Sequence, residues 1–308
     1  MMAQPVVSIV MPTFNRLKFL RMSVRSVLLQ TLQNWELLIA DDGSNQDVLA
    51  YLGTLEEDER VRLLRRPHTG NPGAARNAAI AAAHAPFLAF IDSDDLWAHN
   101  KLQRQIAEML SSPQCGWSYT AFTIIDAEGT PLASEPNRPW TPYGGHIFVQ
   151  TVRTTASIRL PSVIARTELV REVGGFDEAI DCAEDIDLWM RLALRSPICV
   201  VDEPLVCIRR HPGNTRRSVG SIHLARDYSL RKLARRLTGG QRELLAQERS
   251  RNALQMAAAI GDAGGRWRSV VVVGKSLRFS WRYPRWWYGA GRALARVCLP
   301  RTRPPKLS

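Results

Sequence analysis

Cysteine is scarce in this chain, and the few cysteines that occur are widely spaced. The 308 residues include only five, namely Cys115, Cys182, Cys199, Cys207 and Cys298. Their number is odd, no two have C-x-x-C spacing and they form no tight cluster, so neither a disulfide framework nor a structural zinc site is indicated. We expect free thiols and a reducing compartment.

Long apolar runs are also missing. The best candidate, residues 270–273, stops at Gly274 and Lys275, well short of the roughly 18 residues of a membrane-spanning helix. The N-terminus enters an alternating pattern by Val7, without the basic and apolar segments of a signal peptide. We therefore expect a cytoplasmic protein, peripheral at the inner face of the cell membrane if its basic end binds lipid.

Acidic residues are rare in the last third of the chain. Residues 204–308 contain 23 Lys or Arg against four Asp or Glu, whereas residues 1–203 contain 18 against 25, so the net charge of +12 comes from the basic end. This asymmetry predicts two regions with separate tasks. We place the boundary so that residues 1–215 form one domain and residues 216–308 a basic helical region.

The basic region also carries aromatic residues interleaved with arginine. These are Trp267, Trp281, Trp286, Trp287 and Tyr288. The mixture is typical of a segment at an anionic membrane surface, where indole rings lie at headgroup level and basic side chains meet anionic lipid. A basic helical cap folded on the first domain is the alternative. No helix-turn-helix or RNA-binding motif is present, so nucleic acid is not an expected partner.

The first domain reads as strands in alternation with helices. Apolar, β-branched runs predict strands over residues 6–11, 35–40, 60–64, 87–91, 115–125, 161–165, 198–201 and 205–208. Helical periodicity covers residues 17–30, 74–83, 166–173 and 183–194. Such alternation predicts an α/β fold with a mostly parallel sheet covered by helices. Ligands of these sheets bind at the carboxyl ends of the strands.

Polar residues follow the predicted strands, as that rule requires. Residues 13–16 come after the first strand, which is expected to end at Pro12, and residues 41–44 come after the second. Asp92, Ser93, Asp94 and Asp95 come after the fourth. Three carboxylates in four residues repel one another unless a cation or water shields them, and hard Mg²⁺ or Mn²⁺ binds such carboxylates together with phosphate oxygens. The alternative is a solvated turn in which Asp95 caps a helix that begins near Leu96.

Asp42 presents a similar choice. Its Asp-Gly-Ser context is ordinary turn chemistry, but a carboxylate at a strand end can also accept hydrogen bonds from a base imide or a ribose hydroxyl. The Glu184–Asp185 pair is equally open, because acidic residues are favourable in the first turn of any helix.

Six segments in order resemble one enzyme family over roughly residues 6–215. They are VSIVMPTFNR, SVLLQTLQNWELLIADDGS, GNPGAARNAAIAAAHAPFLAFIDSDDLW, GGFDE, EDIDLWMRL and RRHPGNT. Together they resemble family 2 of the glycosyltransferases, which have the GT-A fold. The resemblance implies transfer of a sugar from a nucleoside diphosphate donor with inversion at the anomeric carbon, and a divalent metal cofactor, Mn²⁺ or Mg²⁺.

The resemblance also implies roles for individual residues. It places donor binding at Thr13, Asn15, Asp42, Arg76, Asp92 and Ser93. It makes Asp94 and His211 the metal-binding residues and Asp185 the catalytic base, with Glu184 orienting the base or the acceptor. Each role suits its residue type, because a carboxylate can take the acceptor proton and cations can stabilise the leaving diphosphate.

Substrate identity is predicted only by analogy. A uridine diphosphate sugar is the commonest donor of the family, and a glycan or lipid-linked precursor of a bacterial cell-surface polysaccharide or glycolipid is the expected acceptor. The connection at residues 136–145, with Trp140 and Tyr143, is the expected acceptor-side lid. A non-enzymatic protein that senses nucleotide or binds nucleic acid through the basic region is the rival reading. A nicotinamide-dependent oxidoreductase is disfavoured, because Pro12 to Asn15 stand where G-x-G-x-x-G is required.

Overall fold

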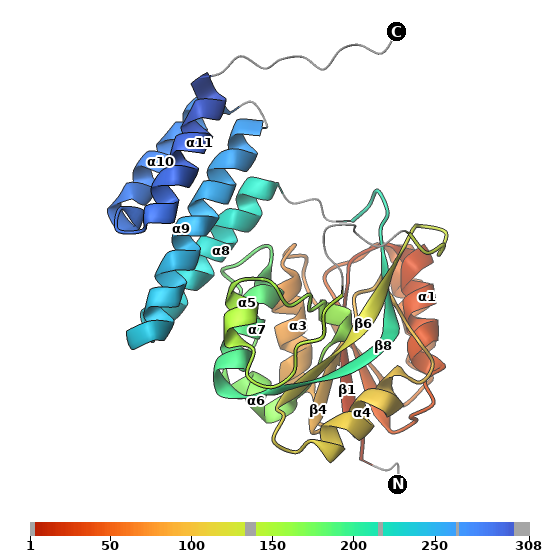
Figure 1. Ribbon diagram of the computed structural model, residues 1–308. Coiled ribbons are helices and arrows are strands. Elements are labelled where there is room, and N and C mark those ends of the chain that lie inside the picture. The colour runs from red at the N-terminus through yellow and green to blue at the C-terminus, as the bar shows by residue number, and fades with distance from the viewer. Residues whose placement is uncertain (1–3, 133–139, 215–217, 263–264, 299–308) are drawn as a thin grey trace. The chain divides into compact units, whose positions relative to one another are not determined.

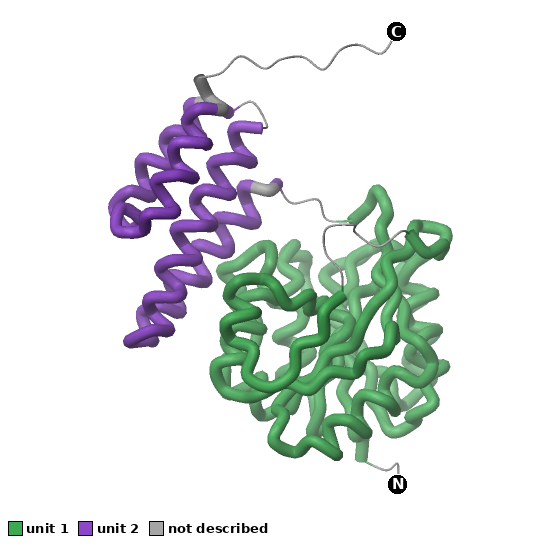
Figure 2. The backbone as a smooth tube through the Cα atoms, in the orientation of Figure 1, with its two compact units in different colours: residues 1–215 green, residues 216–308 purple. Residues whose placement is uncertain are grey.

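The computed structural model describes residues 4–132, 140–214, 218–262 and 265–298. The chain forms two compact units, residues 1–215 and residues 216–308 (Figure 2). The first unit is a sheet with helices packed on it, and the second is helical (Figure 1).

One sheet of eight strands organises the described part of the first unit, in the order β3-β2-β1-β4-β7-β6-β8-β5. The strands are β1 Val7–Thr13, β2 Trp35–Asp41, β3 Val61–Arg65, β4 Phe87–Phe90, β5 Leu96–Trp97, β6 Trp117–Ile125, β7 Ile164–Arg166 and β8 Ile198–Arg209. The pairs β1–β2, β1–β4, β2–β3 and β6–β8 are parallel, whereas β7 is antiparallel to β4 and β6, and β5 to β8. The predicted α/β fold with a mostly parallel sheet is confirmed.

Helices cover the sheet. Those of the first unit are α1 Leu17–Leu28, α2 Gln46–Leu55, α3 Pro72–Ala82, α4 Lys101–Ser111, α5 Phe148–Val152, α6 Thr167–Glu172 and α7 Glu184–Arg195. Alternate residues of β1, such as Ile9 and Met11, share one apolar core with Leu20 and Val24 of α1 and Leu102 of α4. Because strand side chains alternate between faces, this leaves the other face of β1 for α3.

The first strand is longer than predicted. The prediction that Pro12 ends it is wrong, because β1 runs to Thr13. The Val10 carbonyl accepts a hydrogen bond from the Ile91 amide on the β4 side, and Val10 is the last residue of β1 that pairs with β4. The Thr13 carbonyl accepts from the Asp42 amide on the β2 side. Pro12 therefore faces the side on which no ladder partner remains, so its missing N–H costs no hydrogen bond.

Two other boundaries differ from the prediction. Residues 198–201 and 205–208 belong to the single strand β8, which bulges where Val201 and then Pro204 pair with consecutive residues of β6. The capping role considered for Asp95 is also wrong. Residues 96–97 form β5, which pairs with β8, and helix α4 begins only at Lys101.

The second unit consists of four described helices: α8 Val219–Ala234, α9 Gly239–Asp262, α10 Arg266–Ser280 and α11 Pro284–Cys298. The apolar run at residues 270–273 lies inside α10, which continues through Gly274 and Lys275. None of the helices in the described ranges is long and apolar enough to cross a bilayer. Four of the five cysteines are free, and the side chain of Cys298 lies outside the described residues.

Candidate active site

The acidic turn, residues 92–95, follows β4 at the carboxyl edge of the sheet. Its ends are joined by a hydrogen bond from the Asp95 amide to the Asp92 carbonyl at 3.1 Å. Ser93, Asp94 and Asp95 are buried, whereas Asp92 is partly exposed. The turn therefore presents Asp92 outward and holds the other carboxylates inside.

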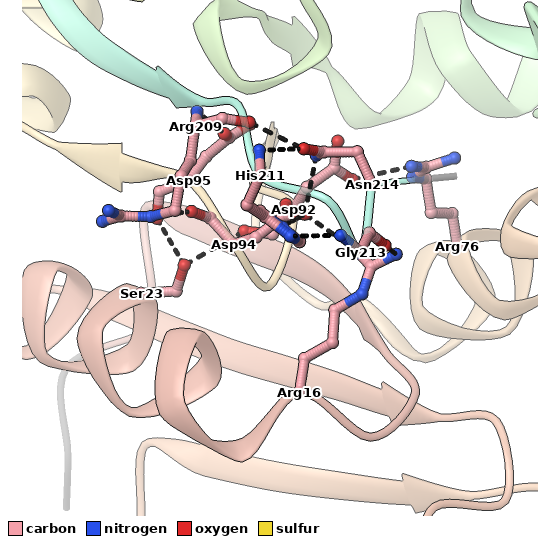
Figure 3. A network of polar contacts seen from close by, with 10 residues as sticks. All are labelled: Arg16, Ser23, Arg76, Asp92, Asp94, Asp95, Arg209, His211, Gly213 and Asn214. Atoms are coloured by element: carbon pink, nitrogen blue, oxygen red, sulfur yellow. Dashed lines mark hydrogen bonds and ion pairs between the residues drawn. The ribbon is translucent and has the colours of Figure 1, made fainter. Parts of the chain in front are cut away.

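The carboxylate of Asp94 is the centre of a network that joins three loops (Figure 3). Its Oδ2 accepts from Arg16 Nη1 at 2.8 Å, from His211 Nε2 at 3.0 Å and from Asn214 Nδ2 at 3.3 Å. Burial, and next the charge of Asp92, raise the pKa of the Asp94 carboxyl above its ordinary value, and Arg16 opposes them. A bound cation would favour the charged form of such a carboxyl.

His211 is held in one tautomer by its neighbours. The Gly213 amide donates to Nδ1 at 3.1 Å, so Nδ1 is an acceptor and the proton lies on Nε2, where it is donated to Asp94. The ring of Phe19 lies 4.3 Å from the imidazole, measured between centroids. Coordination of a metal through Nε2 therefore requires the proton to move to Nδ1 and the Gly213 amide to lose its acceptor.

Arg209 and Ser23 fix the turn from within the fold. The Arg209 amide donates to Asp95 Oδ1 at 2.8 Å and its Nε donates to the Asp94 carbonyl at 3.0 Å. The Ser23 hydroxyl donates to the carbonyls of Asp92 and Asp95. Burial, then the charges of Asp94 and Asp92, raise the pKa of Asp95 well above its ordinary value. Asp95 thus supports the turn from inside.

Arg76 on α3 connects the acidic turn to the start of α7. Its Nη2 lies 2.7 Å from Asp92 Oδ1, and its Nη1 lies 2.7 Å from Glu184 Oε1. The guanidinium is buried and lies 5.3 Å from the centroid of the Phe176 ring. One planar cation therefore holds two carboxylates from elements far apart in the sequence, a geometry that Arg provides and Lys does not.

Asp185 lies beside this bridge in the first turn of α7. Ala183, the residue before α7, has φ 56°, so the chain enters the helix from a left-handed conformation. Asp185 Oδ1 accepts from the Ile186 amide at 2.8 Å. Burial, and next the negative charge of Glu184, raise the pKa of Asp185 to about 6, while Arg76 acts in the opposite direction. A carboxyl with this pKa can accept a proton near neutral pH.

The loop after β1 supplies the other predicted donor residues. Asn15 and Arg16 both have positive φ, 57° and 59°. The Asn15 amide donates to Ser44 Oγ at 2.8 Å, and its side-chain oxygen accepts from the Asn45 amide at 2.9 Å. The buried hydroxyl of Thr13 has no hydrogen-bond partner among the described residues. Two successive left-handed residues are strained, so the surrounding contacts must hold this loop.

Asp42 is engaged within the protein. Its Oδ1 accepts from the amide and hydroxyl of Thr69, and its Oδ2 accepts from the Gly70 amide at 2.8 Å. His68 in the same loop stacks on Phe14, with ring centroids 4.1 Å apart. Asp42 in this structure therefore organises residues 68–70.

The acceptor-side prediction can be followed only in part, since residues 136–139 lie outside the described ranges. The Trp140 indole donates to Asp202 Oδ1 at 2.6 Å, and its ring lies 5.4 Å from that of Tyr119. The Tyr143 amide donates to the Tyr119 hydroxyl at 2.7 Å. This end of the connection is thus anchored on β6 and β8.

The side chains near Asp94 can be compared with the ligands that a divalent metal prefers. In the described ranges no three Asp, Glu, His or Cys side chains converge as a closed metal cage. Asp94 fits a hard divalent cation, whereas His211 fits only after the change of tautomer described above. An open site of this kind takes its remaining ligands from substrate phosphate and water.

Several residues of the network were not selected from the sequence. They are Arg16, Ser23, Arg209, Gly213 and Asn214. Arg16, Arg209, Gly213 and Asn214 did carry a signal, because all four lie inside the segments that resemble the family. Ser23 carried none, because it lies outside those segments and its partners are more than sixty residues away.

The known proteins that this chain is similar to include glycosyltransferases. A profile described as glycosyl transferase family 2 matches residues 8–151. An uncharacterized glycosyltransferase of Rickettsia bellii is 31% identical over 209 residues, 68% of this chain and 29% of that protein. The Escherichia coli protein named UDP-Glc:alpha-D-GlcNAc-diphosphoundecaprenol beta-1,3-glucosyltransferase WfgD is 40% identical over 122 residues, 39% of this chain and 47% of WfgD. The chain thus spans less than half the length of either relative.

Solved structures share the fold. S. aureus TarS 1-349 in complex with UDP-GlcNAc superposes with a TM-score of 0.66 at 17% identity, covering 94% of this chain and 89% of that one. The mannosyltransferase PcManGT from Pyrobaculum calidifontis, in complex with GDP-Man and Mn²⁺, gives 0.62 at 14% identity, covering 96% and 86%. At these identities the likeness establishes the fold alone.

Proposed function

The chain carries a glycosyltransferase family 2 domain with the GT-A fold, and on that premise we propose that it transfers a sugar from a nucleoside diphosphate donor to a hydroxyl acceptor, with inversion at the anomeric carbon. The observation that carries this proposal is the Arg76 bridge. One guanidinium binds both elements: its Nη2 lies 2.7 Å from Asp92 Oδ1 in the acidic turn, and its Nη1 lies 2.7 Å from Glu184 Oε1 in the Glu184–Asp185 pair. A group that binds diphosphate and a group that accepts a proton are thereby kept close.

Asp185 is the proposed base. The acceptor oxygen forms a bond to the anomeric carbon while the bond from that carbon to the diphosphate oxygen breaks. The hydroxyl proton passes to a carboxylate oxygen of Asp185, and the nucleoside diphosphate leaves from the opposite face. A pKa of about 6 leaves Asp185 mostly ionised at neutral pH and still basic enough to take the proton. Glu184 positions Arg76 and raises the pKa of the base.

Asp94 and His211 are the proposed residues that hold a divalent metal. When bound, Mn²⁺ or Mg²⁺ would supply positive charge to the leaving diphosphate. Arg16 already lies 2.8 Å from Asp94 and brings a fixed positive charge to the same place. Asn15, Ser93, Asp92 and the unpartnered hydroxyl of Thr13 are the proposed donor contacts. Asp42 is proposed to contribute to donor binding by holding the loop of residues 68–70.

The finer substrate assignment is also a proposal. A uridine diphosphate sugar is favoured because TarS is described with UDP-GlcNAc and the name of WfgD specifies UDP-Glc. The name of WfgD also specifies a diphosphoundecaprenol acceptor, which favours a lipid-linked glycan in cell-surface polysaccharide synthesis. PcManGT with Mn²⁺ supports the divalent metal. The family match favours this enzyme over the nucleotide-sensing and oxidoreductase alternatives.

The test uses the full chain with UDP-, GDP- and dTDP-sugars in Mn²⁺, Mg²⁺ or chelator. We expect one donor to raise the melting temperature when metal is present. That donor, offered with lipid-linked glycan acceptors, should yield nucleoside diphosphate and a product of inverted anomeric configuration. A retained configuration, or no stabilisation by any nucleotide sugar, would overturn the proposal.

A further inference from the structure

Helix α10 and Trp281, the residue directly after it, expose several large side chains. Trp267, Val271 and Trp281 are 81%, 50% and 64% exposed. With Gly274 and Arg278 between them, they follow the three- and four-residue spacing that keeps side chains on one face of a helix. A methyl group added at Gly274 would meet nothing within 4 Å, so this face is open along its length within the second unit.

The opposite face of α10 combines an apolar residue with small polar ones. Val273 is 4% exposed and packs in the apolar cluster of the unit, and Ser269, Ser276 and Ser280 are 2%, 2% and 0% exposed. Ser269 Oγ donates to the Ala257 carbonyl at 2.7 Å, and Ser280 Oγ donates to Ser250 Oγ at 2.8 Å. The helix thus buries three serines while it exposes Trp267, whereas an ordinary surface helix buries its large apolar side chains.

Helix α11 extends the exposed apolar face. Trp287 and Tyr288 are 53% and 72% exposed, and the Trp287 indole donates to the Trp281 carbonyl at 2.7 Å, so the two helices meet at this aromatic corner. We call the exposed residues Trp267, Val271, Arg278, Trp281, Trp287 and Tyr288 the aromatic face. Exposed aromatic side chains gathered on two neighbouring helices indicate an interaction surface.

The charge around the aromatic face has one sign. Residues 263–308 contain no Asp or Glu. Arg268, Lys275, Arg278, Arg285 and Arg292 are exposed on α10 and α11. Arg282 is paired with Glu243 of α9 at 2.9 Å, so the acidic residues of the unit lie on other helices. Because like charges repel, two copies of this face would not associate, whereas an anionic surface would complement it.

We propose that the aromatic face docks on an anionic lipid bilayer, with α10 lying in the plane of the interface. Indole and phenol rings partition to headgroup level, and arginines around them meet lipid phosphates. Such a helix binds without spanning, consistent with the absence of a spanning helix in the described ranges. This inference does not rest on the proposed glycosyl transfer.

The test is sedimentation of the full chain with vesicles of phosphatidylcholine, with and without phosphatidylglycerol. We expect binding to the anionic vesicles that weakens with salt. Trp267→Ser with Trp281→Ser should reduce affinity about tenfold, because two rings lose their apolar contact. Arg278→Gln and Arg285→Gln should each cost about fivefold. Matched controls on other helices of the unit, Leu224→Ser and Arg235→Gln, should bind like the parent chain.

Quenching by brominated lipid gives a second readout that needs no variant. The parent chain should be quenched in anionic vesicles, and the double tryptophan variant much less. Equal sedimentation of the parent and the double variant would overturn the proposal. The proposal would also be overturned if the parent chain did not bind vesicles but self-associated, or bound an oligonucleotide, through the same two tryptophans. Transfer activity enters none of these readouts, so failure here and failure of the proposed function are distinguishable.

Discussion

The two units of this chain differ in where most of their tryptophans lie, although Trp286 of the second unit is buried like those of the first. In residues 1–215, Trp35 and Trp117 are 2% and 0% exposed and pack within the core. In residues 216–308, Trp267 and Trp281 are 81% and 64% exposed, while Ser280 is fully buried. Since apolar burial is the main stabilising contribution to folding, exposed tryptophans contribute little to the stability of their own unit.

Charged residues differ between the acidic turn and the last two helices. At the acidic turn of the first unit they form neutralising groups, as where Arg76 joins Asp92 and Glu184. Such groups are costly to bury unless every charge has a partner, so they mark a site built for a charged ligand. In the second unit the cations of α10 and α11 face outward without acidic neighbours in residues 263–298. The proposed roles use these charges differently, one for chemistry and the other for contact, and they predict that variants of one unit leave the other unit's readout unchanged.

The largest effect is expected from Asp185→Asn. Loss of the proton acceptor should reduce transfer about 10²–10⁴-fold. Donor-induced thermal stabilisation and vesicle sedimentation should stay as in the parent chain, because the amide keeps the size of the side chain. Glu57→Gln, on the exposed surface of the same unit, is the matched control. Turnover within tenfold of the parent would remove Asp185 as the base.

Asp94→Ala should reduce kcat about 10²–10³-fold, because charge on the leaving diphosphate loses preorganised stabilisation. Stabilisation by Mn²⁺ with donor should disappear from the thermal melt. Asp94→Asn keeps an acceptor for Arg16, His211 and Asn214, and so separates loss of metal from loss of the network. A variant as active in chelator as the parent chain in Mn²⁺ would contradict the metal assignment.

The pH profile should show a smaller effect with a fixed sign. Asp185 must be ionised to accept a proton, so kcat/KM should fall about tenfold per pH unit below its pKa of about 6 and level off above it. Glu184→Gln removes the charge that raises this pKa and releases Arg76, so the acid limb should move to lower pH. An acid limb at an unchanged or higher pH would show that another group controls the profile.

The fold was predictable because strands and their ends have local signals. Apolar β-branched runs marked β1 to β4 within one or two residues, and the acidic turn lay where strand-end chemistry was expected. The strand boundaries that were predicted wrongly depended on which strands pair with one another. Pro12 is tolerated because β4 has already ended, and Pro204 is tolerated because β8 bulges there. Neither condition is visible in the residues around the proline.

The residues of the Arg76 bridge were selected from the sequence, but their contacts were not. Asp92, Arg76 and Glu184 were each assigned separately, but the sequence could not reveal that one guanidinium joins them. Arg209 supports the acidic turn across 115 positions in the chain. Contacts over that distance are fixed by the topology of the sheet, since β8 returns beside β5 only after the whole domain has been traversed.

The smallest effect concerns two adjacent residues, Ser280 at the end of α10 and Trp281 directly after it, and is opposite to the usual rule. Ser280→Leu should destabilise the second unit by about 1–3 kcal/mol, because the site is fully buried and overpacking strains it. Trp281→Ser should change stability by less than about 0.5 kcal/mol, because the ring is 64% exposed, yet it should weaken vesicle binding. Chemical denaturation of the full chain, with transfer measured alongside, checks both. If the tryptophan proved the more destabilising of the two, the aromatic face would be part of a core, and the contrast between the units would fail.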